Sequence, residues 1–103
     1  MADTAPRTPT SLGADLIVDE RRRQIDVKGW TPEHDDQHDQ GQMTTAAACY
    51  ALVNLQDWEH APGIWPWHPD WWKPADDPGR NLVKAGALIA AEIDRLQRNR
   101  PKT

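Results

Sequence analysis

The sequence contains no phenylalanine, one tyrosine and one cysteine. A single cysteine, Cys49, excludes an intrachain disulfide and a cysteine-rich zinc module. No apolar run approaches the roughly 20 residues of a membrane span, and residues 1–10 lack the apolar segment of a secretory signal. With 12 basic and 16 acidic residues the net charge is −4, so the overall field does not favour nucleic acid. We therefore expect a cytoplasmic protein that binds no DNA, RNA or membrane.

The 103 residues are enough for a single domain, which we place at residues 12–98 between a disordered polar tail (1–11) and a short C-terminal tail (99–103). Apolar periodicity predicts helices over residues 12–28, 42–56 and from Asp76 or Asp77 onward, with a short helical turn opening at Thr31-Pro32. No segment alternates apolar and polar residues over a strand's length. The predicted class is all-α, a compact bundle of about three main helices.

Two packing expectations follow from these helices. The alanine-rich segment around Cys49 permits close approach of other helices, so we expect it at the centre, with Cys49 as an inert core residue. The last helix carries one apolar stripe at three- and four-residue spacing, which we expect to be its buried face. The stripe consists of Leu82, Ala85, Ile89, Ile93 and Leu96, with Leu88 beside it.

Tryptophan is unusually abundant in this sequence. The chain has six, and five of them lie among five prolines within residues 57–79. So long a loop in so small a domain is more often functional than accidental, and its prolines stiffen the backbone that carries the indoles. Indoles stack on bases, sugars or cations. We expect about half of them to complete a core that otherwise lacks aromatic residues, and about two or three to face a ligand.

An acidic segment with two histidines follows Trp30. If it is helical, His34 and His38 share one face at a spacing found in zinc and manganese sites, with Asp35 and Asp36 as oxygen ligands and His60 or His68 completing the shell. The alternative, which we favour, is a solvated turn whose carboxylates bond exposed backbone N–H groups, or a polar role in support of a neighbouring site. No metal and no cofactor is therefore expected.

Basic and polar residues surround the start of the last helix: Lys73, Arg80, Asn81 and Lys84. A helix N-terminus with nearby Arg and Lys side chains favours an anion, and a preceding aromatic loop would supply a stacking surface. The alternative is that Arg80 only pairs with Asp76 or Asp77.

The segments ERRRQIDVKGWTPEHDDQH and WWKPADDPGRNLVKAGALI resemble the ryanodine-receptor repeat, or RyR domain, over about residues 14–96. The matching features are Gly29-Trp30-Thr31, the Asp35-Asp36 pair and Arg80-Asn81-Leu82. The chain also looks like small phage and prophage proteins that carry the same segments. The resemblance implies a helical domain that holds an adenine nucleotide, with Trp30 stacking and Arg80 and Asn81 making polar contacts.

The sequence thus predicts a binding module for a nucleotide or NAD-derived molecule, acting in the host cytoplasm as a phage sponge for an immune signal if it is phage-encoded. A homodimer that shares exposed Trp and Ala surfaces is also expected. Two alternatives stay open: a metal-dependent phosphoester hydrolase built on the histidines, and a protein-interaction module that uses the Trp-rich loop. The candidate ligand-binding residues are Trp30, Asp35, Asp36, Trp65, Trp67, Trp71, Trp72, Arg80, Asn81 and Lys84.

Overall fold

The computed structural model describes residues 12–55 and 62–100. The predicted N-terminal tail at 1–11 and the last three residues of the predicted C-terminal tail at 99–103 lie outside these ranges. The helices are α1 (Leu12–Asp26), α2 (Pro32–Asp35), α3 (Gln42–Leu52) and α4 (Pro78–Arg98), with a 3-10 turn η2 (Pro69–Trp71) before α4. The described ranges contain no strand, so the all-α prediction is confirmed. None of their helices is long and apolar enough to cross a membrane.

Local capping signals place several helix ends. The Thr31 side chain accepts a hydrogen bond from the His34 N–H at 3.3 Å, and Pro32 occupies the first turn of α2. Asp77 caps α4 in the same way through the Gly79 N–H at 3.0 Å. After α1 the chain reverses at Gly29, whose φ of +73° lies in the left-handed region that glycine tolerates. These turns match the predictions, although α3 ends at Leu52 rather than near residue 56.

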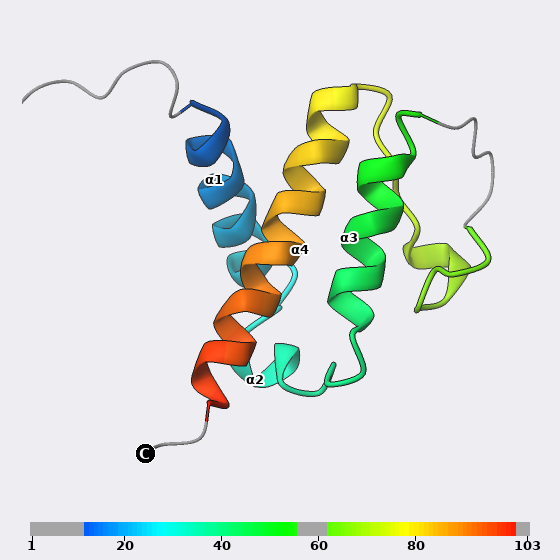
Figure 1. The fold of residues 1–103 in the computed structure, drawn as a ribbon. Coiled ribbons are helices and arrows are strands. Elements are labelled where there is room, and N and C mark those ends of the chain that lie inside the picture. The colour runs from blue at the N-terminus through cyan, green and yellow to red at the C-terminus, as the bar shows by residue number, and fades with distance from the viewer. Residues whose placement is uncertain (1–11, 56–61, 101–103) are drawn as a thin grey trace, which may run out of the picture.

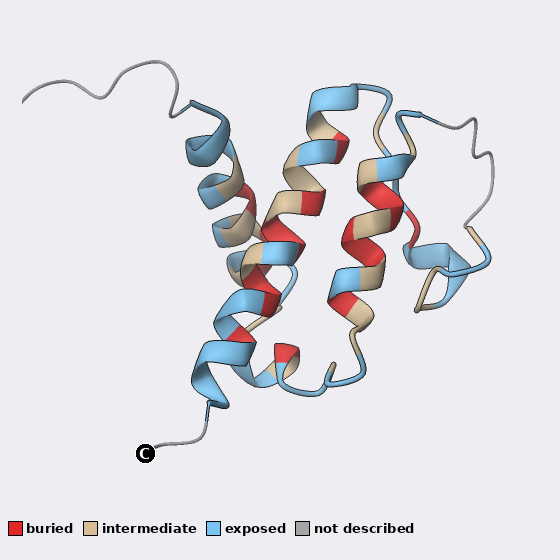
Figure 2. Ribbon diagram, viewed as in Figure 1, coloured by how far each residue is buried: buried red, intermediate tan, exposed pale blue. Residues whose placement is uncertain are grey.

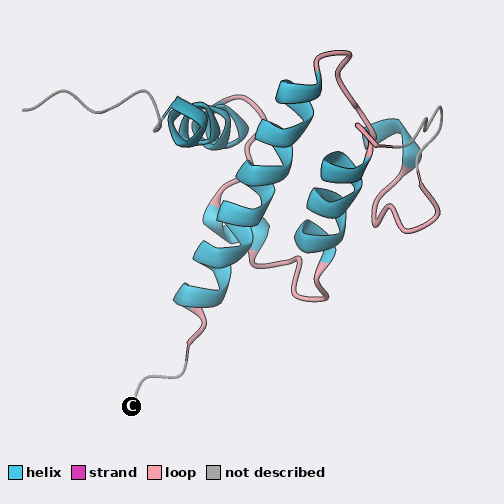
Figure 3. Cartoon of the chain, turned by 45° about the horizontal axis from the view of Figure 1, so that its top comes forward, coloured by secondary structure: helices cyan, strands magenta, loops and turns pink. Residues whose placement is uncertain are grey.

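The central helix is α4, not the alanine-rich helix that we expected at the centre. It packs against α1, α2 and α3, whereas α1 and α3 make no significant contact with each other. Figure 1 shows α4 between the other two long helices, with α3 running antiparallel to it. In Figure 3, α1 is seen almost along its axis while α3 and α4 lie across the view, so α1 crosses them steeply. With 21 residues, α4 is the longest of the described elements, and α1, α2 and α3 all pack along it.

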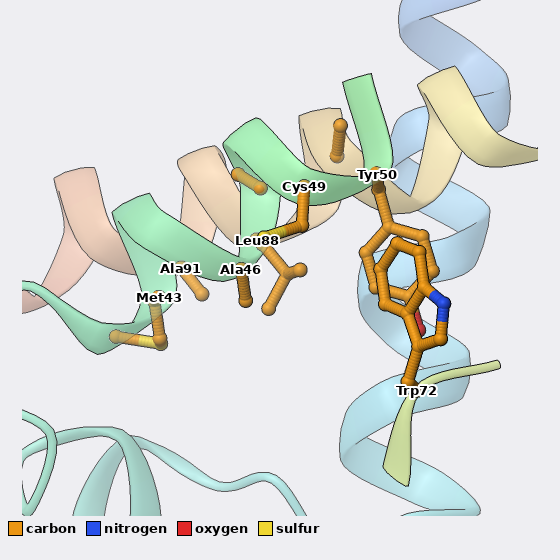
Figure 4. Close-up of a cluster of buried hydrophobic side chains, with 9 residues drawn as sticks. Met43, Ala46, Cys49, Tyr50, Trp72, Leu88 and Ala91 are labelled. Atoms are coloured by element: carbon orange, nitrogen blue, oxygen red, sulfur yellow. The ribbon is translucent and has the colours of Figure 1, made fainter. Parts of the chain in front are cut away.

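The core between α3 and α4 is built mainly from small side chains. Its buried cluster comprises Met43, Ala46, Ala47, Cys49, Tyr50, Trp72, Ala85, Leu88 and Ala91. Figure 2 shows the buried positions of α3 and α4 facing each other, and Figure 4 shows the Tyr50 ring lying against the Trp72 indole at one end of the cluster. Cys49 is fully buried, as predicted. Alanine and cysteine let the two helices approach closely, and the aromatic residues Tyr50 and Trp72 close one end of the interface.

The predicted buried stripe of α4 is wrong in all but two positions. Ala85 and Leu88 are buried, but Leu82, Ile89, Ile93 and Leu96 are each about half exposed. The buried face instead combines alanines with polar residues that find partners there: Asn81, Glu92 and Arg95. The bidentate Glu92–Arg95 pair, at 2.7 and 3.0 Å, allows both charged groups to be buried. The face of α4 with small residues, which allow close approach, is therefore the buried one, although the other face carries larger apolar side chains.

Candidate functional site

A groove lies between α1 and α3, with α4 as its floor. It exists because both helices pack on α4 but not on each other. Its cavity has a volume of about 370 Å³, within the range typical of small-molecule sites. Every element described above contributes to the lining. The helices contribute Glu20, Arg23 and Gln24 of α1, His34 and Asp35 of α2, Met43 and Tyr50 of α3, and Lys84 and Leu88 of α4. The connecting segments contribute Lys28 and Trp30 after α1, His38 before α3, and Trp65, Trp67, His68, Trp71 and Lys73 of the Trp-rich loop.

One wall of the groove is a continuous row of aromatic rings. Trp30 stacks parallel to His34 with centroids 6.0 Å apart, and His34 meets the edge of His38 at 5.0 Å. The row continues from His38 to Trp67 at 5.2 Å and from Trp67 to Trp65 at 5.4 Å. Residues far apart in the sequence thus form one wall in which each ring restricts its neighbours.

The row ends in the core, where Trp65 contacts both Trp72 and Tyr50. Trp72 lies 4.8 Å from Tyr50 and is buried, so it supports the wall from behind. It was expected to contact ligand, and the structure places it in the core instead. Trp71 is the opposite case: its side chain lines the groove and remains 57% exposed. The prediction that the loop divides its indoles between core and site is therefore consistent with their positions, while Trp58 lies outside the described residues.

The described part of the Trp-rich loop, residues 62–77, is held by specific hydrogen bonds. The Trp65 indole N–H donates to the His68 carbonyl at 3.1 Å, and the Lys73 backbone N–H donates to the Tyr50 hydroxyl at 3.2 Å. The Asn81 side chain accepts from the Ala75 N–H at 2.7 Å and donates to the Ala75 carbonyl at 2.9 Å. Asn81 is thus a buried anchor of the loop and does not line the groove, contrary to its predicted role.

A buried polar cluster on α1 forms one side of the groove. Glu20 accepts from Arg23 of its own helix at 2.8 and 3.0 Å and from Arg80 of α4 at 2.5 Å. Burial opposes ionisation of Glu20, but the hydrogen bonds from Arg23 and Arg80 outweigh it and lower the pKa. Arg80 therefore pairs with Glu20 rather than with Asp76 or Asp77, and it lines a smaller hollow on the other side of Glu20. Arg80 and Trp30 do not share the groove, which corrects the expected stacking-and-phosphate arrangement.

Gln24, one helical turn after Glu20, is buried and lines the groove. Its amide nitrogen donates to Glu20 at 3.3 Å, but its oxygen has no hydrogen-bond partner in residues 12–55 and 62–100. A buried acceptor without a partner costs free energy, so an N–H or O–H donor entering the groove would be favoured at this point. Gln24 was not among the predicted site residues, because a glutamine inside a charged run is typical of a solvent-facing position.

The two adjacent aspartates have different surroundings. Asp35 is buried in the groove wall and bonds Arg21 of α1 at 2.7 Å, whereas Asp36 lies outside the groove and pairs with Arg98 at 2.8 Å. The favoured interpretation as a solvated turn is therefore wrong for Asp35. The His34 and His38 rings lie 5.0 Å apart, although α2 ends at Asp35 and does not extend through both as the metal-site hypothesis assumed. Among the described residues no three His, Cys, Asp or Glu side chains form a group that could hold a metal. His60 lies outside those residues.

Basic side chains give the groove a positive balance within an acidic protein. The lining contains four basic residues, Arg23, Lys28, Lys73 and Lys84, and two acidic residues, Glu20 and Asp35. Its net charge is therefore +2 with the histidines neutral, whereas the whole chain has a net charge of −4. Both carboxylates are bonded by arginines, whereas Lys28 and Lys73 form no ion pair with any described residue. Lys84 donates to the Lys73 carbonyl at 2.6 Å, and burial together with Arg80 lowers its pKa. Lys28 and Arg23 were not among the predicted site residues, whereas Lys73 was named with the basic residues near the start of α4.

Mild acid is expected to destabilise the protein through His38. Burial, together with the neighbouring His34, holds the pKa of His38 below its ordinary value of 6.5 despite the opposing effect of Asp35. The unfolded state therefore binds the proton more tightly, and stability falls as the pH drops from about 6.5 toward the lower pKa of the folded state. Melting temperatures at about pH 7.5 and about pH 5.5 should differ less in His38→Asn than in the wild type. Equal differences would contradict this assignment.

The groove thus contains six of the ten predicted ligand-binding residues: Trp30, Asp35, Trp65, Trp67, Trp71 and Lys84. Asp36, Trp72, Arg80 and Asn81 lie elsewhere, each with a structural partner. A comparison with protein-family models, curated proteins and solved structures found no match to the chain.

Proposed function

We propose that the protein binds a small nucleotide-like molecule, one with an aromatic base and an anionic group, in the groove between α1 and α3. The observation that carries this proposal is the combination of an aromatic wall with unpaired ammonium groups in a chain that is acidic overall. Aromatic faces favour a planar base, and a local excess of positive charge favours phosphate.

Each part of such a ligand has a matching group in the groove. Trp30 and Trp71 offer indole faces to the base, while Lys28 and Lys73 offer ammonium groups to phosphate. The Gln24 side-chain oxygen would accept a hydrogen bond from an amine or a hydroxyl of the ligand. The resemblance of the Trp30 and Asp35 segments to ryanodine-receptor repeats supports the same ligand class.

Sequestration is the role that we propose for this binding, as in a sponge for a signalling nucleotide. The hydrolase alternative would need a group of metal ligands, and the described residues contain none of three or more. The protein-interaction alternative is less favoured, because most of the tryptophans of the described loop line a concave groove and are packed against one another. Protein hot spots also need indoles that a partner can reach, and of the five tryptophans that the structure describes only Trp71 is largely exposed.

Calorimetric titration with adenine nucleotides, cyclic dinucleotides and cyclic ADP-ribose isomers tests the proposal, with tryptophan fluorescence as a second readout. For a ligand that binds, Trp71→Ala should remove one stacking face and cost about 1–3 kcal/mol, or roughly five- to 150-fold in affinity. Because Trp71 is exposed, its loss should leave the fold intact.

Ile64→Ala is the matched control. Ile64 belongs to the same loop and is 58% exposed, close to the 57% of Trp71, but it does not line the groove. Its substitution should leave affinity unchanged. If no member of the panel binds, or if Ile64→Ala weakens binding as much as Trp71→Ala, the groove is not the site of a nucleotide-like ligand.

A further inference from the structure

The back of α4 carries an apolar stripe that nothing in the described residues covers. Leu82, Ile89, Ile93 and Leu96 are between 47% and 53% exposed. At 100° per residue, Leu82 lies about 160° around the helix from Lys84, which lines the groove. The stripe therefore faces away from the proposed ligand site.

The spacing of the stripe is that of a helix–helix seam. With Gly86, its positions are 82, 86, 89, 93 and 96, alternating steps of four and three residues as in the a and d positions of a coiled coil. Gly86 has no side chain, but Ile17 of α1 fills that place, lying 2.5 Å from where a Cβ atom would stand. The seam is thus apolar along its whole length.

The rest of the chain offers little to cover this seam. The only large apolar side chains outside the described ranges are Met1 and Trp58. An uncovered stripe of four half-exposed Leu and Ile side chains on a domain of this size indicates an interaction surface.

We propose that the stripe binds a second copy of this chain, with the two α4 helices antiparallel across a two-fold axis. The stripe positions are spaced nearly symmetrically about Ile89. In an antiparallel pair, Leu82 of one copy therefore meets Leu96 of the other, and the two Ile89 residues meet at the axis. Ile93 of one copy then packs near Gly86 and Ile17 of the other.

The charges at the two ends of α4 fit the antiparallel direction. Asp76 and Asp77 precede the helix, and Arg100 follows its last residue, Arg98, whose own side chain is bonded to Asp36. Antiparallel pairing brings the acidic end of each helix beside the basic end of its partner, while parallel pairing would place like charges together. The helix dipoles favour the same direction. Such a dimer leaves both grooves open to solvent, so this inference does not depend on the proposed function.

Analytical ultracentrifugation of the whole chain over a wide concentration range tests the proposal. The wild type should show a concentration-dependent dimer, and Ile93→Glu should weaken dimerisation at least tenfold, because a carboxylate would be buried in the seam. Circular dichroism should show unchanged helix content, since Ile93 does not belong to the core. Val27→Glu is the matched control, an exposed apolar residue that follows α1 and is not on α4.

A charge reversal tests the direction of pairing. Arg100→Glu should weaken the dimer, and adding Asp76→Lys should restore it, because the two residues meet across the interface only in the antiparallel arrangement. Asp77 is avoided because it caps α4. A wild type that stays monomeric at millimolar concentration, an Ile93→Glu protein that dimerises normally, or a charge reversal without restoration would each overturn the proposal.

Discussion

Replacing Trp72 by alanine is expected to lower the free energy of unfolding by about 3–5 kcal/mol. Trp72 is buried and packs against Tyr50 at 4.8 Å and Trp65 at 4.9 Å. Both neighbours are held by hydrogen bonds, Tyr50 through the Lys73 N–H and Trp65 through the His68 carbonyl, so neither ring is free to move into the space left by the indole. A cavity would therefore remain, and its cost adds to the lost burial of the ring.

The neighbouring Trp71→Ala is the control for this prediction. Trp71 is 57% exposed, so its removal should change the unfolding free energy by about 0.5 kcal/mol or less. Urea denaturation followed by circular dichroism measures both variants. A domain of this size has only about 5–15 kcal/mol of stability, so Trp72→Phe should be measured as well, because it retains one ring and should lose less. Equal losses at Trp71 and Trp72 would show that Trp72 is not a core residue.

Asp35→Ala is expected to cost about 3–5 kcal/mol, because it would leave a buried arginine without its partner. The side chains of Asp35 and Arg21 are only 2% and 12% exposed, and their oxygen and nitrogen atoms lie 2.7 Å apart. Arg21 also donates to the Trp30 carbonyl at 3.3 Å. The pair therefore ties α1 to α2 and to the turn that carries Trp30, and its loss should weaken ligand binding as well.

Asp36→Ala provides the comparison, since it removes the next carboxylate in the chain. Asp36 pairs with Arg98 on the surface, where solvent screens the interaction, so a far smaller effect is expected. Thermal and urea unfolding at neutral pH measure both variants. Asp35→Asn separates charge from shape: it should retain packing yet still destabilise the protein. If Asp36→Ala were as harmful as Asp35→Ala, the buried pair would not be the main tie between α1 and α2.

The adjacent residues Trp71 and Trp72, and likewise Asp35 and Asp36, show the limit of prediction from the sequence. Trp71 and Trp72 were predicted together as ligand contacts, and Asp35 and Asp36 were given one role, because adjacent residues of one type carry the same local signal. Which of the two is buried depends on the element that packs against them. For Trp72 that element is α3, through Tyr50, and for Asp35 it is α1, through Arg21.

The groove itself follows from long-range packing. Its walls come from α1, α2, α3 and the Trp-rich loop, and it exists because α1 and α3 both prefer α4 to each other. Lys28 and Gln24 line the groove because α1 packs on α4, and no local pattern in the sequence indicates that contact. Arg80, prominent in the sequence, bonds Glu20, a contact that joins residues 60 positions apart.

What the sequence determined by itself was local. The helical class, the cap at Asp77, the turn that opens at Thr31 and the left-handed Gly29 all depend on interactions within a few residues, whose chemistry the sequence shows directly. The tertiary structure alone decided which face of each helix is buried. On α4 the alanine face packs inward and the Leu82–Leu96 stripe stays outside, because close approach of α3 and α1 requires small residues. Periodicity reveals that a helix has an apolar face, but the shapes of its neighbours decide whether that face is covered.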